Sequence, residues 1–105
     1  MNSSVSVEKL VEALRSLEAL RREIVAIRSR LAEIREARKI LEEKKPGTIF
    51  REIGGLVIEV TLDDALSYLR DEEELLETRL ARLEAEEKKL REEIARLEKE
   101  LGLRR

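Results

Sequence analysis

Hydrophobic residues recur along the chain with the 3.5-residue period of a coiled coil. With Leu10 at heptad position a, nine of the ten a and d positions of the first run are apolar: Leu10, Ala13, Leu17, Leu20, Ile24, Ile27, Leu31, Ile34, Arg38 and Leu41. With Leu66 at a, ten of the twelve positions of the second run are apolar: Leu62, Leu66, Leu69, Glu73, Leu76, Leu80, Leu83, Glu87, Leu90, Ile94, Leu97 and Leu101. These narrow stripes predict helices over residues 5–45 and 62–101 that pair as an antiparallel coiled coil. Glu73 and Glu87 are expected to fix its register.

Capping and stop signals bound both predicted helices. Pro46 and Gly47 are expected to end the first helix. Thr61 and Asp64 resemble a capping box for the second, and Gly102 is its natural stop. The cap of the first helix is expected to be a serine: Ser3, Ser4 or Ser6.

Between the helices, in residues 48–61, the apolar period changes from 3.5 to 2. Two runs of strand-forming residues flank Gly54 and Gly55, which favours a β-hairpin with a two-residue turn. In that register one face carries five apolar residues and a single charge: Ile49, Arg51, Ile53, Leu56, Ile58 and Val60. The opposite face is mixed: Thr48, Phe50, Glu52, Val57, Glu59 and Thr61. The predicted fold is mainly α, with one hairpin between two long helices.

The predicted hairpin requires partners. A two-stranded ribbon is marginally stable in water, and this one has two unpaired edges and an apolar face. Two helices are too thin to cover both edges, whereas copies or relatives of the chain can continue the sheet. We therefore expect an oligomer joined through strand pairing.

A second group of apolar residues gathers near the two ends of the chain. If Leu10 pairs with Leu97 and Leu41 with Leu66, several apolar residues outside the seam meet seam residues at one tip of the coiled coil. The group is Val5, Val7, Leu10, Val11, Leu14, Leu97, Leu101 and Leu103. One interpretation is a site for hydrophobic segments of other proteins. The other, equally weighted, is fraying, a register shift or self-association.

Composition excludes much chemistry. The 105 residues contain neither Cys nor His, so a thiolate nucleophile, an imidazole base, a disulfide and the usual zinc sites are excluded, and an enzyme is not expected. Asp63 and Asp64 are interpreted as helix-capping residues because no further metal ligands are suitably spaced. We expect no metal and no cofactor.

Charge disfavours nucleic acid as a partner. The net charge is −2, from 22 basic and 24 acidic residues. It divides into +3 over residues 1–45, −7 over 46–78 and +2 over 79–105, and the basic segments contain interspersed acidic residues. An RNA-binding arm would need a stronger basic face.

Two further features of the sequence bear on the protein's source and cellular location. Asn occurs once and Gln never, which favours a thermophilic source, with compositional drift as the alternative. No apolar run approaches the roughly 20 residues that cross a bilayer, and the first residues lack the blocks of a signal peptide. A cytoplasmic protein is expected.

The order of helix, single hairpin and helix resembles the beta subunit of archaeal prefoldin. The most specific part is the segment 51–60, Arg-Glu-Ile-Gly-Gly-Leu-Val-Ile-Glu-Val, which leads into Leu-Asp-Asp-Ala-Leu at 62–66. The resemblance covers nearly the whole chain and implies that residues 1–105 form a single domain. It implies an α2β4 hexamer in which beta copies and alpha-type subunits assemble through their hairpins into β-barrels. It also implies an ATP-independent holdase that passes unfolded polypeptides to a group II chaperonin.

Carried onto this sequence, the resemblance assigns two sets of residues. The barrel role falls to Ile49, Phe50, Ile53, Leu56, Val57, Ile58 and Val60. The client-binding role falls to Val5, Val7, Leu10, Val11, Leu14, Leu97, Leu101 and Leu103. The alternative function is an architectural coiled-coil adaptor that oligomerises without binding clients.

Overall fold

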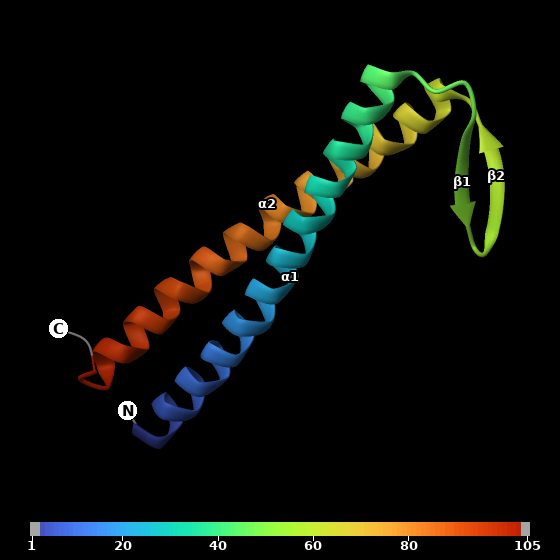
Figure 1. Ribbon diagram of the computed structural model, residues 1–105. Helices are drawn as coiled ribbons and strands as arrows, with labels where there is room; N and C mark the ends of the chain where they lie inside the picture. The colour runs from blue at the N-terminus through green and yellow to red at the C-terminus, as the bar shows by residue number, and fades with distance from the viewer. Residues whose placement is uncertain (1–2, 104–105) are drawn as a thin grey trace. The chain divides into compact units, whose positions relative to one another are not determined.

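The computed structural model describes residues 3–103, which form two compact units. The terminal unit contains residues 3–27 and 79–103, and the hairpin unit contains residues 28–78. The chain runs through helix α1 (Ser3–Lys44), strands β1 (Ile49–Ile53) and β2 (Leu56–Val60), and helix α2 (Leu62–Glu100), as Figure 1 shows. The predicted order of helix, hairpin and helix is confirmed.

Helix α1 begins and ends differently from the sequence prediction in detail. It begins at Ser3, so Ser3, Ser4 and Ser6 all lie inside the helix and the prediction that one of them caps it is wrong. At the other end the backbone turns left-handed at Lys45, with φ of 43°, and not at Gly47. The Lys45 amide donates to the Leu41 carbonyl at 3.0 Å, which satisfies one of the last free carbonyls of α1.

Both ends of helix α2 follow their sequence signals. The Asp64 amide donates to the hydroxyl oxygen of Thr61 at 3.1 Å, so Thr61 is the N-cap. At the C-terminal end Gly102 has φ of 73°. The Leu103 amide donates to the Glu98 carbonyl and the Gly102 amide to the Lys99 carbonyl, which together form a Schellman motif.

In the terminal unit the predicted seam is the core. One cluster of buried side chains joins the first half of α1 to the second half of α2: Leu10, Ala13, Leu17, Ile94 and Leu97, with Leu90 and Leu101 packed against it. Ion pairs cross the same helix pair, Arg21 to Glu87 at 3.3 Å and Arg79 to Glu23. The predicted neighbourhood of Leu10 and Leu97 is confirmed.

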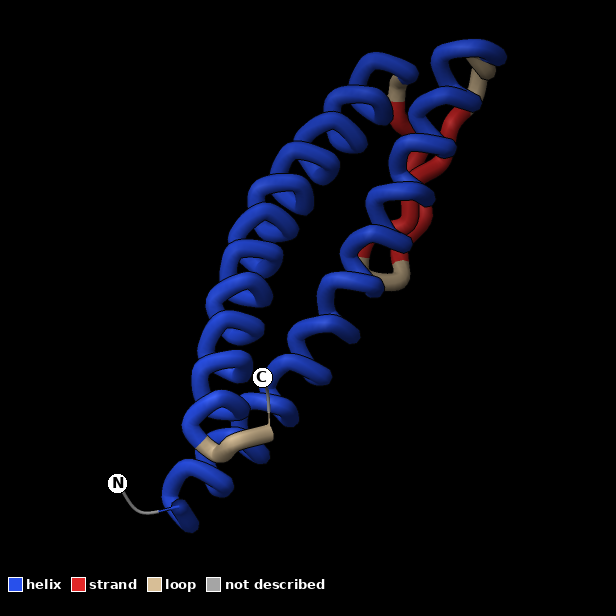
Figure 2. The backbone as a smooth tube through the Cα atoms, turned by 90° about the vertical axis from the view of Figure 1, so that its left-hand side faces the viewer, coloured by secondary structure: helices blue, strands red, loops and turns tan. Residues whose placement is uncertain are grey.

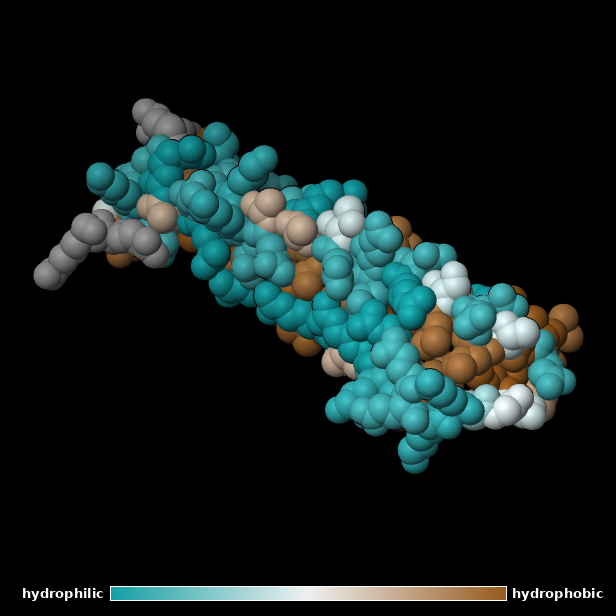
Figure 3. Space-filling model, turned by 90° about the horizontal axis from the view of Figure 1, so that it is seen from above, coloured by the Kyte–Doolittle hydropathy of each residue, from teal (hydrophilic) through white to brown (hydrophobic). Residues whose placement is uncertain are grey.

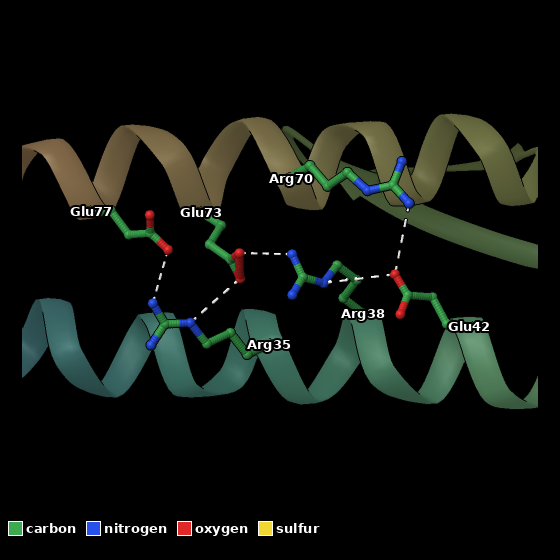
Figure 4. A network of polar contacts seen from close by, with 6 residues as sticks. All are labelled: Arg35, Arg38, Glu42, Arg70, Glu73 and Glu77. Atoms are coloured by element: carbon green, nitrogen blue, oxygen red, sulfur yellow. Dashed lines mark hydrogen bonds and ion pairs between the residues drawn. The ribbon is translucent and has the colours of Figure 1, made fainter.

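In the hairpin unit an apolar core borders a layer of charge. Leu31 and Ile34 are almost fully buried, at 2% and 1% exposure, and Ala65 and Leu66 are buried on α2. Next to them in the seam, the Arg38 guanidinium donates to the Glu73 carboxylate at 2.7 Å. Figure 4 shows this pair at the centre of a network whose other members are Arg35, Glu42, Arg70 and Glu77.

The hairpin has the predicted register. Ile49 pairs with Val60, Arg51 with Ile58, and Ile53 with Leu56, so these six residues share one face. Gly54 and Gly55 both have positive φ, 55° and 84°, as a type I′ turn requires. The hairpin contacts the start of α2, because the Arg51 guanidinium carbon lies 3.4 Å from the centre of the Tyr68 ring. Figure 2 shows the two strands, in red, leaving the helix ends and meeting at the tan turn.

Candidate functional site

The hairpin offers both of its edges for pairing. Among residues 3–103 the sheet has two strands only, so the outer edge of β1 and the outer edge of β2 have no strand neighbour within the chain. Unpaired edges of this kind present rows of backbone donors and acceptors to another strand. The edges are therefore one candidate interface.

Both faces of the hairpin expose large apolar side chains. The seven residues predicted for assembly all lie in this ribbon, and only Ile49 and Val60 are partly covered. The other five are exposed by 42% to 69% of their surface: Phe50, Ile53, Leu56, Val57 and Ile58. In Figure 3 brown apolar surface gathers over this part of the molecule. The ribbon combines open edges with open apolar faces, as a strand-pairing interface needs.

In the terminal unit the structure divides the predicted client-binding residues. Leu10 and Leu97 are buried at 8% and 4% exposure, and Leu101 is half-buried beside them. The other five side chains are exposed by 40% to 67%: Val5, Val7, Val11, Leu14 and Leu103. The buried residues hold the two helices together, and the exposed ones supply apolar surface around them.

One exposed apolar residue of the terminal unit is missing from the predicted client-binding residues. Val25 is 63% exposed and shares a shallow groove with Leu14 on one side of α1. The groove measures about 430 Å³ and is lined by Leu14, Leu17, Glu18, Arg21, Arg22 and Val25. A partial signal was present: Val7, Val11 and Leu14 follow the seam's alternation of four- and three-residue steps, and Val25 continues it after the charged positions Glu18 and Arg21.

The polar contacts described in residues 3–103 include ion pairs and helix caps. Residues 3–103 contain no group of three side chains suited to hold a metal ion. Asp63 and Asp64 lie in the first turn of α2, where negative charge interacts favourably with the helix dipole. Within the same range, neither helix has a segment apolar enough to pass through a bilayer.

Comparison with known proteins agrees with these features. No curated protein matches the chain. It is similar to the crystal structure of the prefoldin beta subunit from Thermococcus strain KS-1, with a TM-score of 0.86 and 26% identity, over 98% of this chain and 93% of that one. A family model described as prefoldin subunit matches residues 5–103. The chain therefore belongs to the prefoldin subunit family, as a chaperone-type subunit of the beta class.

Proposed function

We propose that the chain is a beta subunit of an α2β4 hexamer that holds unfolded polypeptides without ATP. In this proposal the hairpins join alpha-type and further beta subunits into β-barrels. The exposed apolar surface of the terminal unit binds clients, which pass to a group II chaperonin in the cytoplasm of a thermophilic archaeon. The single observation that carries the proposal is a ribbon with two open edges and five exposed apolar side chains.

The energy available from assembly is substantial for so small a chain. Full burial of a large apolar side chain contributes about 1.5 to 3 kcal/mol. The five exposed hairpin residues retain 42% to 69% of their accessible surface. Covering that surface would therefore contribute of order 5 kcal/mol per hairpin. Since a lone two-stranded ribbon is marginal in water, this burial and the pairing of its edges favour association.

The proposed client surface suits weak and unselective binding. Four of its side chains, Val5, Val7, Val11 and Leu14, are 40% to 48% exposed and lie on one helix, while Leu103 follows the other. Leu10 and Leu97 act in this proposal by fixing the helices beneath that surface, and Leu101 packs against their cluster. Each contact is small, so retention of a client would depend on several subunits binding it together.

Assembly is tested by placing a charge in the ribbon. Ile58→Asp is expected to abolish the hexamer with an alpha-type partner in native mass spectrometry while helical circular dichroism is retained. The matched control, Glu59→Asp, keeps a carboxylate at the adjacent exposed position and is expected to assemble. An intact hexamer in the Ile58→Asp variant would remove the hairpin from the interface.

Client binding is tested in the assembled complex. Changing Val7, Val11 and Leu14 together to Ser is expected to abolish most suppression of thermal aggregation of a model client. The control changes Ile40 and Leu75 to Ser, because these side chains are also exposed, by 44% and 63%, but lie in the hairpin unit. Equal loss in both variants would contradict the assigned surface. A wild-type hexamer with no effect on aggregation would favour the architectural adaptor.

A further inference from the structure

Arg51 is the one charged residue on an otherwise apolar face of the hairpin, and the structure gives it an aromatic partner. Its guanidinium carbon lies 3.4 Å from the centre of the Tyr68 ring. Tyr68 belongs to the second turn of α2 and lies outside the a and d positions of the seam. Heptad periodicity explains neither residue.

Arg51 contacts an aromatic ring, where other arginines of the hairpin unit contact carboxylates. Other arginines of the hairpin unit, Arg35, Arg38 and Arg70, contact glutamates, whereas Arg51 forms no ion pair with any residue of 3–103. Both Arg51 and Tyr68 are partly buried. A planar guanidinium stacks on an aromatic face and is attracted by its π electrons, and partial burial strengthens the attraction.

The contact holds the middle of β1 and leaves the turn end of the hairpin open. Ile49 and Val60, at the end of the ribbon next to the helices, are partly buried, as is Arg51. Beyond Arg51 the same face opens, with Ile53 at 46% and Leu56 at 69% exposure. In Figure 1 the strands diverge from the start of α2 toward their turn. Tyr68 thus contacts the middle of β1 and leaves both outer edges and the turn accessible.

We propose that Arg51 and Tyr68 form a clamp that orients the hairpin on α2 for pairing with neighbouring subunits. Both are positioning residues, and the inference rests on the proposed assembly through hairpins. Residues 45–48, between α1 and β1, lie outside the helices and strands, and Thr61 alone joins β2 to α2, so the clamp adds a side-chain contact that limits swinging of the ribbon about these connections. When only a fraction of subunits holds the pairing-competent orientation, the apparent dissociation constant rises by the inverse of that fraction.

The test measures the concentration at which half of the beta subunits are assembled with an alpha-type partner, by sedimentation velocity. Tyr68→Leu is expected to raise this midpoint about 3- to 30-fold, the range that corresponds to one cation–π contact. Tyr68→Phe keeps the ring and is expected to stay within about 2-fold of wild type. The matched control, Arg82→Ala, removes an exposed arginine of α2 that lies in the terminal unit, and is expected to leave the midpoint unchanged.

Substitution of Arg51 distinguishes the clamp from a direct role of Arg51 in the interface between subunits. Arg51→Ala is expected to weaken assembly as Tyr68→Leu does, and Arg51→Lys to fall between them and wild type. In a clamp the double variant Arg51→Ala with Tyr68→Leu is no weaker than either single variant. Additive losses, or a midpoint unmoved by Tyr68→Leu, would overturn the proposal.

A second measurement separates failure of the clamp from failure of the proposed function. In a chain kept unassembled by Val57→Asp, whose charge lies on the face opposite Arg51, the ring of Tyr68, the only tyrosine, is expected to shift the Arg51 side-chain protons upfield in NMR spectra, and Tyr68→Leu to abolish the shift. If the shift is present but neither Arg51→Ala nor Tyr68→Leu changes the assembly midpoint, the clamp is overturned, while assembly through hairpins is unaffected. If Ile58→Asp leaves the hexamer intact, the proposed assembly fails and the clamp fails with it.

Discussion

The charged layer in the hairpin unit permits a quantitative prediction. Arg38 and Glu73 both occupy a positions of the seam, which are otherwise apolar around them. Their side chains are 30% and 13% exposed, and they meet at 2.7 Å (Figure 4). We predict that Arg38→Ala and Glu73→Ala each lower the free energy of unfolding. We also predict that the double variant loses less than the two single losses added together.

The size of this coupling follows from the contact geometry. A hydrogen bond to a charged group contributes about 1.5 to 3 kcal/mol when it is shielded from water. Arg35 lies 3.5 Å from the other oxygen of Glu73 and keeps part of that interaction when Arg38 is removed. We therefore expect a coupling of about 1 to 2 kcal/mol. The control pair, Arg22 with Glu18, is about 70% exposed at both side chains, and such pairs contribute about 0.3 to 0.5 kcal/mol.

Urea unfolding followed by circular dichroism measures both couplings, at one fixed protein concentration because assembly adds to apparent stability. With an m value of about 1.5 kcal/mol/M, the seam coupling corresponds to roughly 1 M in summed midpoint shifts, and the control coupling to about 0.3 M. Equal couplings for the two pairs would refute the reasoning. In that case burial of Glu73 would not strengthen its ion pair, and register would have to depend on the apolar seam alone.

Three backbone sites give further predictions by the same assay. Lys45→Gly is expected to raise the free energy of unfolding by about 0.5 to 1 kcal/mol, because Lys45 occupies a left-handed conformation that glycine adopts without strain. A lower free energy of unfolding would show that contacts of the lysine side chain outweigh this strain. Thr61→Ala is expected to cost about 1 kcal/mol through loss of the bond from the Asp64 amide, whereas Thr61→Ser should retain it. Gly55→Ala is expected to lower the free energy of unfolding by about 1 to 2 kcal/mol through its φ of 84° alone, since no atom crowds the site. Gly47→Ala is the control, because Gly47 has no positive φ, and it is expected to change the free energy of unfolding little.

The sequence by itself determined the elements and the hairpin register. Heptad spacing placed Leu10, Leu17 and Leu97 in the seam, and all three are buried. Gly54 and Gly55 fixed a two-residue turn, which sets every pair from Ile53 with Leu56 outward. These features are predictable because periodicity and turn chemistry depend on residues close together in the chain.

Only the tertiary structure decided which of the off-pattern residues meet. It paired Arg51 with Tyr68 and Arg38 with Glu73, and it separated buried Leu10 from exposed Leu14 within one predicted cluster. It also placed the left-handed end of α1 at Lys45, ahead of Pro46 and Gly47. The physical reason is that burial and pairing depend on atoms brought together from distant parts of the chain, whereas a repeat in the sequence records only which side of its own helix or strand a residue occupies.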